Sequence, residues 1–137
     1  MPPMIRIVMG ALVRDDQMLL VHRSPSRPVH PDVWSLGGGH MEPGETELAA
    51  LARELDEELG VQMVPGSAIH LCRLQVGRGG EAVHFSAWIV EEWEGKPVNA
   101  APEEHDEIRW FRPAELPPLT PEPVRTALIE AMRNTRA

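Results

Sequence analysis

The sequence has 137 residues, about the length of one domain, and we expect a single domain over residues 1–137. Its hydrophobic fraction of 42% and charged fraction of 25% are those of globular proteins, which excludes collagen-like, coiled-coil and disordered chains. With 13 basic and 21 acidic residues, the formal net charge is −8, which argues against binding to a nucleic-acid polymer because such binding needs a basic face.

Alternating and apolar runs predict mostly strands in the first third of the chain, followed by one clear helix. The strands are expected at Ile5–Val13, Gln17–His22 and Val33–Leu36. Proline and glycine content predicts loops at 23–32 and at Gly37–Gly44. The helix is expected at Glu45–Leu59, with Gly60 ending it.

The second half of the chain repeats the order of strands followed by a helix. Strands are predicted at Ile69–Val76, Ala82–Glu91 and Ile108–Phe111, with a turn at Gly77–Gly80 and a loop at Lys96–His105. Thr120, Pro121 and Glu122 then predict the start of a last helix. This order indicates a mixed α/β fold whose sheet is covered on both faces.

The predicted helix at 45–59 separates apolar from acidic residues. Its leucines fall on one face, whereas Glu54, Glu57 and Glu58 gather on the opposite face as i, i+3 and i+4 neighbours, with Glu47 pointing the same way. A solvated acidic face is one interpretation. The other is a site for a hard cation such as Mg²⁺ or Mn²⁺, because the acids lie at the wrong end for the helix dipole and a glycine-rich loop precedes them.

The spacing of these residues resembles a known family signature. The pattern looks like the Nudix box of the MutT-like hydrolases. It consists of Gly39, then five residues, Glu45, then seven residues, and finally the run Arg53-Glu54-Leu55-Asp56-Glu57-Glu58-Leu59-Gly60-Val61. The resemblance implies an α/β fold, the Nudix-type α/β/α sandwich around a mixed β-sheet. It also implies hydrolysis of a diphosphate (acid anhydride) bond with Mg²⁺, or alternatively Mn²⁺, as cofactor.

The resemblance also implies roles for individual residues of the box. Glu57, Glu58 and the main-chain carbonyl of Gly38 would be metal ligands. Glu54 would be a ligand or the general base that activates water. Arg53 would hold the glutamates in place by ion pairs.

MutT-like members use a further glutamate from a late loop as a ligand or base. This loop offers Glu103, Glu104 and Glu107. Counting back from Trp110 favours Glu104, with Glu107 second. All three are otherwise expected to be solvated loop acids.

The resemblance also suggests residues that contact the substrate. Arg23 follows the second strand and is a candidate for a phosphate contact or, equally, an ordinary surface arginine. His40 lies in the box loop, where it would touch a phosphate when protonated or simply belong to the loop. The aromatic rings available for a base-binding slot are Trp34, Phe85, Trp88 and Trp110, of which Trp34 and Trp88 are the candidates. Rings at strand positions, such as Phe85, Trp88 and Trp110, more often pack in cores.

The substrate is narrowed chiefly by elimination to a nucleoside diphosphate linked to another group, foremost a nucleoside triphosphate with an ordinary or modified base. The stretch 119–123 carries no asparagine, so a preference for oxidised guanine is not implied. The alternatives are a non-catalytic nucleotide-binding domain and an isomerase that would need Cys72 as a reactive thiol.

Compartment and assembly follow from the remaining features. Cys72 is the single cysteine, which excludes an internal disulfide. Neither a signal peptide nor a membrane span is recognisable, so a cytoplasmic protein without a membrane partner is expected. We expect a monomer or homodimer.

Overall fold

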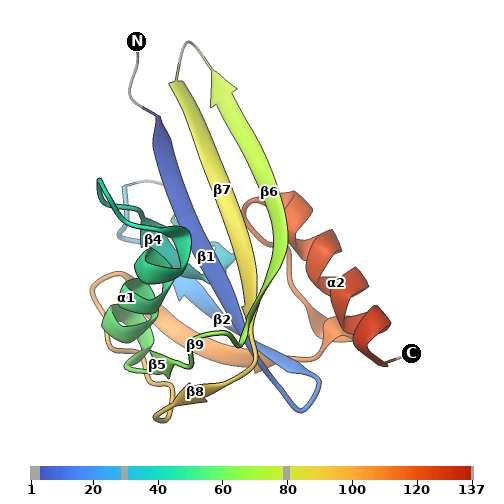
Figure 1. The fold of residues 1–137 in the computed structure, drawn as a ribbon. Coiled ribbons are helices and arrows are strands. Elements are labelled where there is room, and N and C mark those ends of the chain that lie inside the picture. The colour runs from blue at the N-terminus through green and yellow to red at the C-terminus, as the bar shows by residue number, and fades with distance from the viewer. Residues whose placement is uncertain (1–3, 29–30, 79–80, 137) are drawn as a thin grey trace.

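The computed structural model describes the chain except residues 1–3, 29–30, 79–80 and 137 (Figure 1). Its described strands and helices follow one another in a mixed α/β order. They are β1 (Ile5–Arg14), β2 (Gln17–Arg23), β3 (Trp34–Ser35), β4 (Gly37–His40), α1 (Glu47–Leu59), β5 (Gln62–Met63), β6 (Ala68–Arg78), β7 (Glu81–Val90), β8 (Trp93–Glu94), β9 (His105–Phe111), the 3₁₀ turn η1 (Pro113–Glu115) and α2 (Glu122–Arg136).

Among the described residues, seven strands form one mixed sheet, with β5 and β8 pairing separately. The main path runs β3-β2-β1-β7-β6; β4 also pairs with β1, and β9 with β2. Strand β1 pairs in parallel with β7 along Ile5–Leu12, whereas its pairing with β4 is antiparallel. The sheet therefore contains both senses of pairing, as the mixed fold predicted.

The two helices cover opposite faces of this sheet (Figure 1). Alternation along β1 explains how, because Val8 and Leu12 pack in the core with α1, whereas Met9 and Ala11 pack in the core with α2. The result is the Nudix-type α/β/α sandwich expected from the sequence.

Helix α1 begins two residues later than predicted, because Thr46 is its N-cap and accepts a hydrogen bond from the Ala49 N–H at 3.1 Å. Gly60 ends the helix in the left-handed conformation, as expected. Helix α2 begins at Glu122, the last of the three residues predicted to start it.

Several loop predictions were wrong in part. Residues Gly37–His40 form strand β4 rather than a loop, since pairing with β1 overrides the low strand preference of glycine. The last strand begins at His105 rather than at Ile108, and the short pair β5 and β8 was missed. The turn predicted at Gly77–Gly80 falls partly outside the described residues.

No helix in the described part of the chain has the length and apolar character needed to cross a membrane.

Candidate active site

Strand β4 brings glycine backbone directly against the acidic side of α1. The Gly38 N–H donates to Glu58 Oε1 at 3.3 Å. A side chain on Gly39 would place its Cβ 2.7 Å from the Glu54 carboxylate, and one on Gly38 would lie 2.1 Å from the Val8 carbonyl oxygen. These glycines are therefore required for the close approach of β4 to the helix carboxylates.

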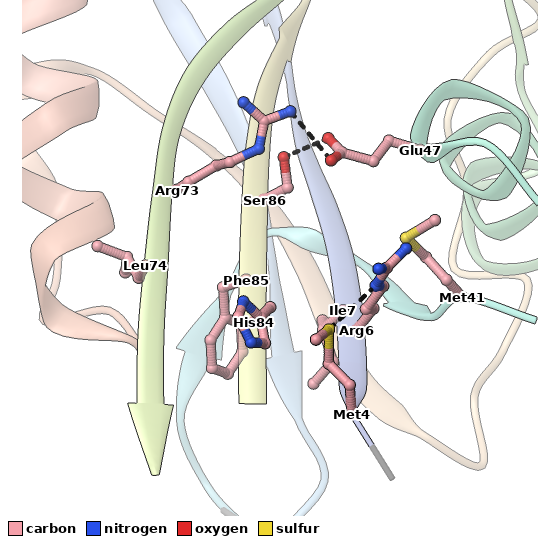
Figure 2. A pocket seen from close by; sticks show the side chains of 10 residues that line it. All are labelled: Met4, Arg6, Ile7, Met41, Glu47, Arg73, Leu74, His84, Phe85 and Ser86. Carbon is pink, nitrogen blue, oxygen red and sulfur yellow. Dashed lines mark hydrogen bonds and ion pairs between the residues drawn. The ribbon is translucent and has the colours of Figure 1, made fainter. Parts of the chain in front are cut away.

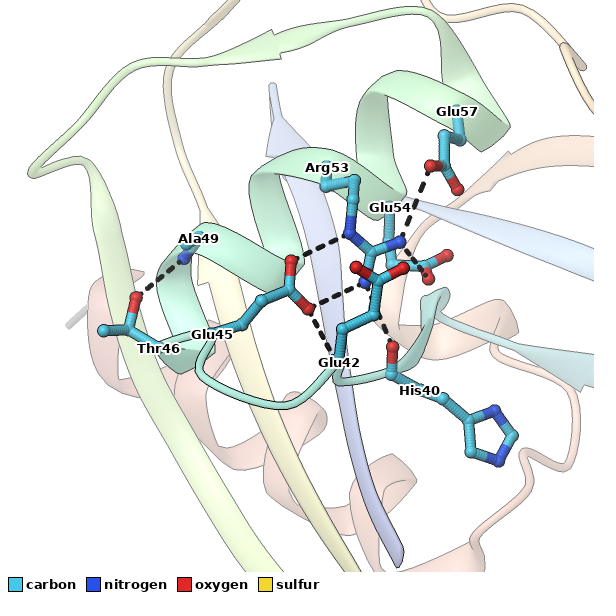
Figure 3. A network of polar contacts seen from close by, with 8 residues as sticks. All are labelled: His40, Glu42, Glu45, Thr46, Ala49, Arg53, Glu54 and Glu57. Carbon is cyan, nitrogen blue, oxygen red and sulfur yellow. Dashed lines mark hydrogen bonds and ion pairs between the residues drawn. The ribbon is translucent and has the colours of Figure 1, made fainter.

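Arg53 joins the loop before α1 to the acids of the helix (Figure 3). Its guanidinium donates two bonds to Glu45, at 2.8 and 2.9 Å, and one to Glu54 at 3.0 Å. It also donates to the His40 carbonyl at 3.1 Å and lies 3.5 Å from Glu57. The Arg53 hydrogen bonds lower the pKa of Glu45 to about 2, and this network raises the pKa of Arg53. Arg53 therefore lies where the resemblance expects a residue that holds the glutamates.

Glu54 and Glu58 form a sequestered pair of carboxyl groups. Glu58 is 3% exposed, and the Glu54 side chain is 12% exposed. Burial raises the pKa of Glu58, and the contact with Glu54 raises it further. Glu57, in contrast, has a 58% exposed side chain. The interpretation of a wholly solvated acidic face is therefore wrong for Glu54 and Glu58.

Strand β9 and the segment after β2 form the facing wall of the site. One cavity, with a volume of about 660 Å³, is lined by Glu54 and Glu58 on one side. The same cavity is also lined by Arg23, Arg27, Glu104 and His105. Arg27 Nη2 lies 3.9 Å from Glu104 Oε1, and His105 Nε2 lies 3.7 Å from Glu58 Oε1. Burial lowers the pKa of His105, which favours a neutral imidazole beside the glutamates.

Much of the remaining cavity wall is apolar. This part comes from β1, β7 and the segment around β3, and it includes Ile5, Ile7, Met9, Leu36, Val83 and Phe85. The cavity thus combines charged and apolar lining residues, a composition that suits a ligand with a polyanionic group and a flat apolar ring.

The donor set fits a hard divalent cation. Among the described side chains, no three His, Cys, Asp or Glu residues already form a complete metal cluster. Nevertheless, Glu54 and Glu58 are pressed together in a buried place, where their mutual repulsion opposes ionisation of both. A cation bound by their oxygens would relieve this repulsion, and oxygen ligands are those that Mg²⁺ and Mn²⁺ prefer.

The structure gathers most of the predicted site residues around one cavity. The lining contains Arg23, Gly38, His40, Arg53, Glu54, Glu58 and Glu104. Glu57 lies beside it through its contact with Arg53. Glu107 instead pairs with Arg109, so Glu104 is the late-loop acid that the fold brings to the cavity.

The two candidate tryptophans have partners elsewhere in the fold. Trp34 packs edge-on against Phe111, with ring centroids 5.0 Å apart, and Trp88 donates its indole N–H to Glu47 at 3.1 Å. The described lining of the cavity includes neither ring, whereas Phe85 does line it. Sequence reasoning assigned Phe85 to the core because it lies at strand spacing.

Glu47 shares a helix face with Glu54 but lies about two turns earlier and has its own partners on the sheet (Figure 2). Its carboxylate accepts bonds from Ser86 at 2.5 Å and from Arg73 at 3.0 Å, besides that from Trp88. It lines a second cavity of about 370 Å³, which shares Ile7 and Phe85 with the first but contains none of Glu54, Glu58 and Glu104. Glu47 therefore attaches the first turn of α1 to β6 and β7.

Two residues of the site, Arg27 and His105, were missed from the sequence, and both line the cavity. Cys72 packs against the core on the α2 side, as expected of a small apolar residue on a strand. The sequence places His105 directly after Glu104, which is the one signal that pointed to it. Burial raises the pKa of the Cys72 thiol, which does not suit the reactive thiol that an isomerase would need.

The sequence matches a known protein family and two characterised relatives. The family model described as NUDIX domain matches residues 4–132. The chain is 32% identical over 134 residues to the CTP pyrophosphohydrolase of Escherichia coli strain K12, covering 98% of this chain and 95% of the relative. It is also 43% identical over 58 residues to nucleoside triphosphatase NudI of Salmonella agona, covering 42% of this chain and 41% of the relative.

Solved structures agree with the sequence relatives. The crystal structure of a MutT Nudix hydrolase from Burkholderia pseudomallei superimposes with a TM-score of 0.80 at 30% identity, covering 92% of this chain and 96% of the other. The solution structure of the E. coli ORF135 protein gives a TM-score of 0.75 at 31% identity, covering 98% and 91%. The box, the fold and these relatives agree, and the chain therefore belongs to the Nudix hydrolase family as a MutT-like member that acts on pyrophosphate bonds.

Proposed function

We propose that this protein is a Mg²⁺-dependent pyrophosphohydrolase whose substrate is a nucleoside triphosphate with an ordinary or modified base. The observation that carries the proposal is the sequestered Glu54–Glu58 pair, which lines a cavity together with arginines and apolar side chains. The full-length similarity to a CTP pyrophosphohydrolase supports a nucleotide substrate.

The roles of the chain's own residues follow from this arrangement. Arg23 and Arg27 lie on the wall where they would receive the phosphates, and Phe85 with the neighbouring aliphatic side chains would contact the base. The ligands of the cation would be Glu54, Glu57, Glu58, Glu104 and the Gly38 carbonyl. When bound, the cation would neutralise phosphate charge and favour ionisation of water. Glu54, oriented by Arg53, would accept the proton of the attacking water or share that task with Glu104.

The test is product formation from a panel of compounds, with Mg²⁺ and with EDTA. The panel contains ordinary and oxidised nucleoside triphosphates, nucleotide sugars, ADP-ribose and dinucleotides, and added pyrophosphatase converts any pyrophosphate into phosphate for detection. Analysis of the nucleotide product shows which bond breaks. We expect Mg²⁺-dependent turnover of a triphosphate, reduced to background in Glu58→Gln.

Two results would contradict the proposal. A folded protein that binds nucleotide tightly without metal-dependent product would instead be a nucleotide-binding domain. Turnover confined to nucleotide sugars, ADP-ribose or dinucleotides would leave the family assignment intact and overturn the triphosphate assignment.

A further inference from the structure

His22, at the end of β2, connects three segments that surround the candidate active site. Its Nδ1 lies 2.7 Å from Asp106 Oδ1 on β9, and its Nε2 lies 3.1 Å from Asp32 Oδ1, before β3. The imidazole also packs against Trp34 of β3, with ring centroids 4.8 Å apart. The His22 side chain is 16% exposed, so it is enclosed although both carboxylates reach solvent.

The Asp106 contact falls at an irregularity in the sheet. Along β2 and β9, His22 pairs with Glu107, but Arg23 pairs with His105. Asp106 is therefore the extra residue of a β-bulge, a feature that redirects side chains beside active sites. The bond from His22 to Asp106 fixes this bulge immediately after Glu104 and His105, both of which line the cavity.

The contact between His22 and Asp32 lies beside the backbone that carries Arg23. The Asp32 N–H donates to the Arg23 carbonyl at 3.1 Å, and the Arg23 N–H donates to the Val33 carbonyl at 2.8 Å, so the base of the segment after β2 is closed. The Ser24 N–H then donates to the Glu104 carbonyl at 3.0 Å. The backbone that carries Arg23 is thereby attached to the backbone that carries Glu104.

We propose that His22, through Asp106 and Asp32, is a positioning residue that sets Glu104 relative to Arg23 and Arg27. The described lining of the cavity does not include His22, so its effect passes through these neighbours. The proposal rests on the proposed function, in which Glu104 holds the cation, but its effect on metal binding is measurable without any substrate. A displacement of about 1 Å at such a site costs up to about 100-fold in rate.

The test compares His22→Phe with two other variants. Phenylalanine keeps a ring against Trp34 but loses both carboxylate contacts. Asp106→Asn keeps a polar partner for His22 Nδ1, so this conservative variant should retain the positioning of Glu104. His84→Phe makes the same change on β7, on the wall of the second cavity, and serves as the matched control.

Two readouts distinguish positioning from mere stability. The first is Mn²⁺ affinity, measured by electron paramagnetic resonance on the folded protein with the metal alone. The second is the division of any activity loss between kcat and KM. For His22→Phe we expect Mn²⁺ affinity and kcat each to fall about 10-fold, with near wild-type values for Asp106→Asn and His84→Phe.

A His22→Phe variant that melts at a lower temperature but keeps wild-type Mn²⁺ affinity and kcat would overturn the proposal. If His22→Phe does not fold, Asp106→Ala takes its place and the same outcomes apply. A wild-type protein that binds Mn²⁺ but hydrolyses no triphosphate would refute the proposed function alone, since the Mn²⁺ affinities still test the role of His22. A wild-type protein that binds no Mn²⁺ would overturn both.

Discussion

At the scale of single residues, the site depends on keeping carboxyl groups where water solvates them poorly. Glu58 is nearly inaccessible and touches Glu54, whereas Glu45 lies in a bidentate ion pair with Arg53. The pKa values of these two acids are consequently shifted in opposite directions from that of an ordinary glutamate. The pKa of Glu58 is raised by burial, and that of Glu45 is lowered by hydrogen bonds from Arg53.

Glu58→Gln is expected to stabilise the metal-free protein. The folded state binds a proton at Glu58 more tightly than the unfolded state does, so ionisation of this group opposes folding above about pH 4.5. Glutamine keeps the shape without the charge, and a gain of about 1–2 kcal/mol at pH 7 is typical of relieved active-site strain. Thermal melts in EDTA at pH 7 and pH 4 check this. An equal or lower melting temperature at pH 7 would contradict it.

Glu45→Gln is expected to destabilise the folded protein at pH 7, the opposite of the effect of Glu58→Gln. Because the folded pKa of Glu45 is about 2, its stabilising contribution is fully present above the unfolded value of about 4.5 and is lost as pH falls toward 2. The variant should therefore melt at a lower temperature than wild type at pH 7, and the difference should shrink between pH 4.5 and 2. A pH-independent difference would show that lost packing, rather than the ion pair, is responsible.

At the scale of elements, α1 is held at its beginning by two separate devices. The Thr46 hydroxyl caps the helix. Glu47, in the next position, binds Ser86 and Arg73 on the sheet (Figure 2), and it also accepts a hydrogen bond from Trp88. The acids that face the cavity lie one or more turns farther along, so the geometry of the site depends on where this helix starts.

Thr46→Ala is expected to lower the free energy of unfolding by about 1 kcal/mol, because the Ala49 N–H loses its partner. Thr46→Ser restores the hydroxyl and is the matched control. Urea denaturation at pH 7 measures the difference. If serine is as destabilising as alanine, the lost Thr46 methyl contacts rather than the cap account for the change.

At the scale of the whole molecule, the site lies where three parts of the fold meet. Strand β4 supplies Gly38, α1 supplies Glu54 and Glu58, and the segments around β2 and β9 supply Arg23 and Glu104. A cation bound between these parts is expected to stabilise the entire fold. Binding to the folded state alone raises the free energy of unfolding by about 2.7 kcal/mol when the free cation is at 100 times its Kd.

Mg²⁺ should therefore raise the melting temperature of the wild type in a concentration-dependent way, while Glu58→Gln shows little or no rise. Differential scanning calorimetry over a Mg²⁺ series makes the comparison, and NaCl at matched ionic strength controls for screening of the net charge. A rise that NaCl reproduces equally would indicate general screening instead of a specific site.

The sequence was sufficient for the local part of this site because the box residues lie within one continuous stretch. Helical periodicity placed Glu54, Glu57 and Glu58 on one side of α1, and counting from Trp110 selected Glu104 over Glu107. Arg23 was placed correctly beside the cavity but not distinguished from an ordinary surface arginine.

The parts that were missed depend on contacts between distant segments. Strand β4 forms because β1 supplies partners for a run of glycines, and the bulge at Asp106 depends on its register with β2. Neither strand propensity nor residue spacing carries this information.

The parallel pairing of β1 with β7 also has a consequence for synthesis on the ribosome. Ile5–Leu12 must wait for Val83–Val90, about 80 residues later, before its central pairing partner exists. At cellular elongation rates this delay is roughly 4–16 s. During that time an apolar first strand has a free edge in the nascent chain, which makes it a natural target for protection by chaperones.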